Sequence, residues 1–105
     1  MQILVDADAC PVKDIIVRFA KKYNIPVTML IDTSHILDDG YSKVITVDKG
    51  RDSADIRLVN MIEDGDIVVT QDFGVAAMAL AKGAKVLNQN GMVYNDSNMD
   101  HAVLI

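Results

Sequence analysis

Five short apolar runs, rich in β-branched residues and separated by polar or helix-like segments, constrain the fold of this chain more than any other feature. Runs of this length that are apolar throughout are typical of strands buried on both faces. Such strands occur in parallel sheets with helices on both sides. The chain therefore predicts a three-layer α/β/α fold with a mainly parallel central sheet of about five strands. The runs are residues 3–5, 27–31, 44–47, 67–70 and 84–87.

Three segments between these runs predict helices, because each carries residues that favour a helix start or stop. The first follows Pro11 and ends at Asn24, the second begins at Asp52 or Ser53 and ends at Gly65, and the third covers 73–82. A further short strand is expected at 92–94. The apolar faces expected on the first two helices are Ile15, Ile16, Phe19 and Ala20, and then Ile56, Val59, Asn60 and Ile62.

Composition narrows the class of protein. Half of the 105 residues are hydrophobic, which suits a single domain over 1–105. Its core is expected to be aliphatic, since the chain has two Phe, three Tyr and no Trp. Few aromatic platforms for stacking on bases are expected. A net charge of -5 disfavours broad adhesion to nucleic acid or anionic membrane, although bound metal would reverse the sign of an acidic pocket.

Cysteine content and apolar stretches predict the compartment. The single cysteine, Cys10, excludes an internal disulfide and any zinc site that needs two thiolates. No apolar stretch approaches the ~18 residues of a membrane span, and the N-terminal residues lack the pattern of a signal peptide. We expect a cytoplasmic protein with no membrane association.

The acidic residues are 14 Asp and one Glu. Aspartate favours caps, turns and metal sites, whereas glutamate is the usual acid of exposed helices. The acids are therefore expected at the ends of elements. Those interpreted as plain turn formers or caps are Asp32, Asp38, Asp39, Asp64, Asp66 and Asp96.

Three aspartates have a different predicted setting, because they follow strands of a parallel sheet, where ligands bind beyond the carboxyl ends. Asp6 follows the first strand, Asp55 lies in the helix after the third, and Asp72 follows the fourth. Each alone is also explained as a cap or turn residue. Together they predict a site for Mg²⁺ or Mn²⁺, which prefer oxygen ligands.

Other side chains of the same edge have supporting roles in this prediction. Carboxylate and hydroxyl groups at the loops would be auxiliary ligands, and basic groups would hold phosphate oxygens. Each of these residues is also explained as a cap or a solvated side chain. The auxiliary candidates are Asp8, Asp52 and Ser53, and the phosphate-binding candidates are Lys13, Lys49 and Arg51.

Three segments in order, 5–13, 50–55 and 66–72, resemble the YaiI/YqxD family of bacterial proteins, and the likeness spans essentially the whole chain. That family is grouped with PIN-like and NYN-type domains, in which acidic residues gather divalent metal for RNA cleavage. The resemblance implies a PIN-like fold with Asp6, Asp55 and Asp72 as metal-binding catalytic acids. Members of the family usually continue into a further C-terminal segment, and this chain stops at the apolar residues 103–105.

The leading functional prediction is a Mg²⁺- or Mn²⁺-dependent ribonuclease-like hydrolase that acts on phosphodiesters. Two alternatives stay open. The Asp6-Ala7-Asp8 segment also resembles the start of haloacid-dehalogenase-like phosphatases, in which the first Asp is a nucleophile and the second an acid/base. The other alternative is a binding module that holds metal or RNA in an acidic crevice and catalyses no reaction.

Overall fold

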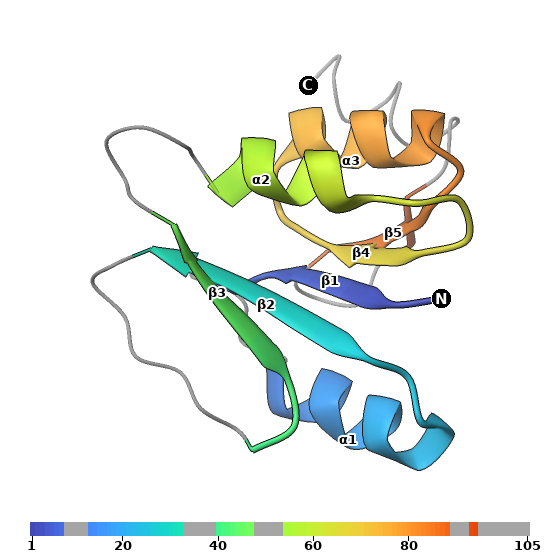
Figure 1. Cartoon of the computed structure of the whole chain (residues 1–105). Coiled ribbons are helices and arrows are strands. Elements are labelled where there is room, and N and C mark those ends of the chain that lie inside the picture. The colour runs from blue at the N-terminus through green and yellow to red at the C-terminus, as the bar shows by residue number, and fades with distance from the viewer. Residues whose placement is uncertain (8–12, 33–39, 48–53, 89–92, 95–105) are drawn as a thin grey trace.

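The computed structural model describes residues 1–7, 13–32, 40–47, 54–88 and 93–94. Within these ranges the chain is a mixed α/β structure with a six-stranded sheet and three helices (Figure 1). In chain order the elements are β1 (Ile3–Asp6), α1 (Lys13–Tyr23), β2 (Val27–Asp32), β3 (Lys43–Val47), α2 (Ala54–Met61), β4 (Ile67–Val69), α3 (Phe73–Ala81), β5 (Lys85–Leu87) and β6 (Val93–Tyr94).

The sheet is mostly parallel, which confirms that part of the prediction. Its strand order is β3-β2-β1-β4-β5-β6, and β1 to β5 run in one direction. Ile3 of β1 is opposite Val27 of β2 on one side and Ile67 of β4 on the other. The short strand expected at 92–94 is present as β6, which pairs antiparallel with β5 and makes the sheet six-stranded.

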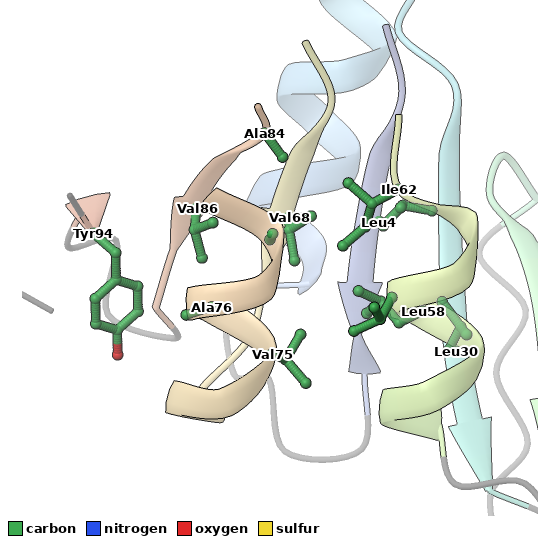
Figure 2. Packing of buried hydrophobic residues seen from close by; sticks show 12 residues of the cluster. Leu4, Leu30, Leu58, Ile62, Val68, Val75, Ala76, Ala84, Val86 and Tyr94 are labelled. Atoms are coloured by element: carbon green, nitrogen blue, oxygen red, sulfur yellow. The ribbon is translucent and has the colours of Figure 1, made fainter. Parts of the chain in front are cut away.

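Helices pack on both faces of the sheet (Figure 1). Because side chains alternate along a strand, Ile3 and Val5 of β1 belong to a cluster with α1, whereas Leu4 belongs to a cluster with α2 and α3. Figure 2 shows the second cluster, in which side chains of the two helices meet side chains of the sheet. Its labelled members are Leu4, Leu30, Leu58, Ile62, Val68, Val75, Ala76, Ala84, Val86 and Tyr94.

The predicted inner face of α1 was wrong in half of its residues. Val17 and Ala20 are buried and Ile16 is half-buried, but Ile15 and Phe19 are 62% and 52% exposed. Apolar residues occupy two neighbouring rows of this helix, and both rows have helical spacing. Only contact with the sheet decides which row is buried.

The same correction applies to α2. Leu58 is completely buried and Val59 and Ile62 are nearly so, whereas Ile56 is 57% exposed and Asn60 is exposed. Leu58 and Val59 of the helix, with Ile62 just after its end, face β1 and β2, so Ile56 lies outside the core despite its apolar side chain.

The turn between α3 and β5 requires a glycine. Gly83 has a φ of +86°, in the left-handed region, and a Cβ on it would collide with Oδ1 of Asp64. Ala84 N donates to Ala79 O at 3.0 Å, which closes the helix end. The predicted helix stop at Gly83 is confirmed.

Asp66 is a buried carboxylate at the amino edge of the sheet, only 2% exposed. It accepts hydrogen bonds from Gln2 N (3.3 Å), Gln2 Nε2 (2.9 Å) and Glu63 N (2.9 Å). The bond from Glu63 fits the predicted turn role. The bonds from Gln2 add a long-range role, because they tie the start of β1 to the turn before β4.

None of the helices in the ranges given above has the length and apolar character that crossing a bilayer requires.

We expect Leu58→Ala to lower the free energy of unfolding by about 2–5 kcal/mol, because it removes a fully buried side chain from the α2 side of the core. Ile56→Ala is the matched control on the same helix and should change it by less than about 0.5 kcal/mol. Urea denaturation of both variants measures the difference. Equal losses would show that the burial of α2 is misassigned.

Asp66→Asn should lower the free energy of unfolding by about 1–3 kcal/mol. The NH₂ group of the asparagine would replace one carboxylate oxygen, so at least one N–H group that now donates to Asp66 would lose its acceptor. Asp64→Asn, at an exposed acid two residues away, is the control and should be close to neutral. Thermal unfolding of the two proteins provides the comparison. A neutral Asp66→Asn would contradict the structural role of this carboxylate.

Candidate functional site

The strand order reverses between β1 and β4, because β2 and β3 follow on one side and β5 on the other. In open α/β sheets this reversal leaves a crevice at the carboxyl ends of the two strands, where ligands bind. Asp6 is the last residue of β1, and Asp72 comes three residues after Val69, the end of β4. Two of the three predicted acids therefore flank the reversal.

Asp72 is held in place by local hydrogen bonds. It is the N-cap of α3, and its Oδ1 accepts from Val75 N at 3.0 Å. Its own N–H donates to Thr70 Oγ1 at 3.1 Å. Thr70 is 2% exposed, and its N–H donates to Leu87 O of β5 at 3.0 Å. A buried threonine thus anchors an exposed aspartate to the sheet.

The sequence pattern places Thr70 at the end of the predicted strand 67–70 and does not single out this role. The signal was present in the Thr-Gln-Asp spacing, since a hydroxyl two residues before an N-cap can accept from the cap's N–H. Gly74 contributes space, because a Cβ there would lie 3.1 Å from Asp72 Oδ1.

A shallow hollow of about 310 Å³ lies beside Asp72, between α2 and α3. Most of its walls are aliphatic, and Asn60 and Asp72 supply polar groups. Sequence reasoning missed it, because it placed Asn60 on the inner face of α2. The lining residues are Ile56, Val59, Asn60, Asp72, Gly74, Val75 and Met78.

Asp6 is half-buried and is paired with Leu30 of β2 in the sheet register. Asp55 is the second residue of α2, a helix that follows the carboxyl end of β3 and runs back toward the start of β4. The backbone therefore begins α2 at the same edge of the sheet as Asp6. The side chain of Asp55 lies outside the description.

Lys13 is the first residue of α1, and its Nζ donates to Ala7 O at 3.0 Å. Since Ala7 directly follows Asp6, this bond places the ammonium group near the carboxyl end of β1. An ammonium group has three donors, so one bond to a carbonyl leaves capacity for a phosphate oxygen. Five of the other predicted site residues lie outside the described residues: Asp8, Lys49, Arg51, Asp52 and Ser53.

Among the residues whose side chains are described, no three or more His, Cys, Asp or Glu are grouped so that they could hold a metal ion. Magnesium is commonly bound through one or two carboxylates and several waters. The two acids that flank the strand reversal, Asp6 and Asp72, match that smaller requirement in number and ligand type.

The effect of removing the N-cap of α3 on stability can be measured without an activity assay. We expect Asp72→Ala to lower the free energy of unfolding by about 1 kcal/mol, because the N–H of Val75 loses its acceptor. Asp72→Ser and Asp72→Asn keep a capping oxygen and should stay within a few tenths of a kcal/mol of the unmodified chain. Chemical denaturation tests this order, and equal stability of all three variants would contradict it.

Comparison with known proteins identifies the family of this chain. The family model described as "Uncharacterized BCR, YaiI/YqxD family" matches residues 4–105. A "UPF0178 protein" of Ruminiclostridium cellulolyticum is 76% identical over 100 residues, which is 95% of this chain and 65% of that protein. Another of the same name, from Alkaliphilus oremlandii, is 60% identical over 104 residues, covering 99% of this chain and 67% of that protein.

A third "UPF0178 protein", from Natranaerobius thermophilus, is 50% identical over 104 residues, covering 99% of this chain and 71% of that protein. The chain thus spans about two thirds of the length of these relatives. No solved structure matches it significantly. The match over nearly all of the sequence shows that this chain belongs to the uncharacterised bacterial YaiI/YqxD family.

Proposed function

We propose that this chain is a divalent-metal-dependent, ribonuclease-like hydrolase of phosphodiesters that uses Asp6, Asp55 and Asp72. The observation that carries the proposal is the pair of aspartates at the strand reversal, Asp6 at the end of β1 and Asp72 just beyond β4. Ligands of open α/β sheets bind at this position, and carboxylates there suit a hard cation better than an apolar ligand.

The donor set fits Mg²⁺ or Mn²⁺. Asp72 is exposed, and its bond to Val75 N uses one of two carboxylate oxygens, so the cap role and a ligand role are compatible. Asp55 would add a third carboxylate from the start of α2. When bound, such an ion stabilises charge on a phosphoryl oxygen and lowers the pKa of a coordinated water.

The chain's own residues would position the substrate and this acidic group. Thr70 holds the backbone of Asp72 through a bond to its N–H. Lys13 begins α1 beside the end of β1 and would attract a phosphate oxygen of the substrate. The proposal keeps Lys49 and Arg51 in the same phosphate-binding role, and Asp8, Asp52 and Ser53 as auxiliary groups, with RNA as the substrate.

The same proposal includes a three-layer, PIN-like architecture. Its support is the parallel sheet with α1 on one face and α2 and α3 on the other, together with the acids that the three resembling segments contain.

The test is cleavage of a fluorescently labelled single-stranded RNA with Mn²⁺ or Mg²⁺, with EDTA as the metal-free arm. Asp72→Asn and Asp6→Asn should lower the rate at least about 100-fold, the scale of losing one preorganised electrostatic group in a site. Asp72→Asn keeps the helix cap, so a lost rate is not a lost fold. Asp64→Asn, purified identically, controls for contaminating nuclease and should retain the full rate.

Equal rates in the unmodified chain and Asp72→Asn would refute the assignment. Two other outcomes would redirect it. Release of phosphate from an aryl phosphate that disappears in Asp6→Asn would indicate the phosphatase reading. Binding of Mn²⁺ and RNA in a calorimeter without turnover would indicate a binding module.

A further inference from the structure

The outer face of α1 carries a row of exposed apolar side chains. Ile15, Phe19 and Tyr23 are 62%, 52% and 55% exposed, and their spacing of four residues places them along one side of the helix. The rings of Phe19 and Tyr23 lie 4.7 Å apart between centroids, tilted by 48°. The opposite side of the helix, with Val17 and Ala20, is already packed on the sheet.

Two basic residues, Arg18 and Lys22, lie on one flank of this row. Helix α1 contains four basic residues and one acid, Asp14, in a chain whose net charge is -5. Arg18, Lys21 and Lys22 are exposed, and Lys22 Nζ lies 5.5 Å from the centroid of the Tyr23 ring. Lys21 lies on the other side of the helix, where its Nζ is 5.8 Å from the centroid of the Tyr41 ring and where it lines a shallow hollow of about 300 Å³ with Asp14, Val17 and Arg18. Positive charge is therefore concentrated beside two exposed aromatic rings.

We propose that the exposed face of α1 binds single-stranded nucleic acid, with bases stacked on Phe19 and Tyr23 and phosphates held by Arg18 and Lys22. Surfaces that bind single strands combine these two elements, aromatic rings and a basic track along the backbone. This inference rests on the proposed function, which gives RNA as the substrate, and adds that the RNA is bound as a single strand. Lys13 begins α1 beside the end of β1, so a strand on this face would lead toward Asp6.

The positive charge of the α1 face and the narrowness of its apolar row favour single-stranded nucleic acid over a protein or a membrane. A stable protein interface buries about 800 Å² per partner, and the apolar row is a single line of three side chains with cations along one flank. A membrane-bound helix needs a broad apolar face, but the broad face of α1 is occupied by the sheet. Duplex nucleic acid keeps its bases stacked internally and would leave Phe19 and Tyr23 without partners.

The experiment measures fluorescence anisotropy of a labelled 12-nucleotide RNA titrated with the chain in EDTA, so that binding is observed without cleavage. Phe19→Ala and Tyr23→Ala should each weaken binding at least about fivefold, because each removes a stacking partner. Lys22→Glu should weaken it and make it less sensitive to salt. Val93→Ala and Lys85→Glu, at exposed positions on β6 and β5, are the matched controls and should bind within about twofold of the unmodified chain.

Three results would overturn the inference: no RNA binding by the unmodified chain, equal binding by the α1 variants and their controls, or a duplex of the same sequence bound as tightly as the single strand. Phosphatidylserine vesicles and light scattering complete the test. Phe19-dependent vesicle binding or self-association, without Phe19-dependent RNA binding, would assign this face to a membrane or a second copy. RNA binding by the unmodified chain without cleavage in Mn²⁺ would contradict the proposed function and leave this inference standing, so the two failures are distinguished.

Discussion

The pairing of β1 on both of its sides is the constraint on which the rest of the structure depends. β1 pairs with β2 and β4, and Ile3, Leu4 and Val5 are each 3% exposed or less, with alternate side chains entering the two hydrophobic clusters. A strand in this position, with helices on both faces of the sheet, must be apolar on both faces, and the helical connections make it parallel to its neighbours. The strand reversal beside β1 follows from it, and so does the position of Asp6 at the edge where α/β proteins bind ligands.

The two edges of the sheet use aspartate in opposite ways. At the amino edge, Asp66 is buried and accepts three hydrogen bonds that join the start of β1 to the turn before β4. At the carboxyl edge, Asp72 is exposed and only one of its oxygens is used by the cap of α3. A buried acid whose acceptors are satisfied holds the fold together. An exposed acid fixed by its own helix remains available to a ligand, and this difference supports the proposed site.

Much of the fold was predictable because short apolar runs and helix stops are local signals. The five predicted apolar strands, the short strand expected at 92–94 and all three helices occur near their expected positions, and Gly83 ends α3 as expected. The helix faces were less predictable. Ile15 and Phe19 of α1 and Ile56 of α2 have the right spacing and polarity for burial but are exposed, because another row of each helix packs on the sheet. Spacing identifies candidate rows, and only contact selects one of them.

The sequence alone determined the alternation of strands and helices and the family, because both depend on residues close together in order. It also indicated that Asp6 and Asp72 follow strands. Only the tertiary structure decided that β1 and β4 are neighbours at a strand reversal, since that depends on pairing between residues more than sixty positions apart. It likewise placed the hydroxyl of Thr70 within hydrogen-bonding distance of the Asp72 N–H and left Phe19 and Tyr23 exposed beside Arg18 and Lys22, because burial depends on what each side chain meets across the sheet.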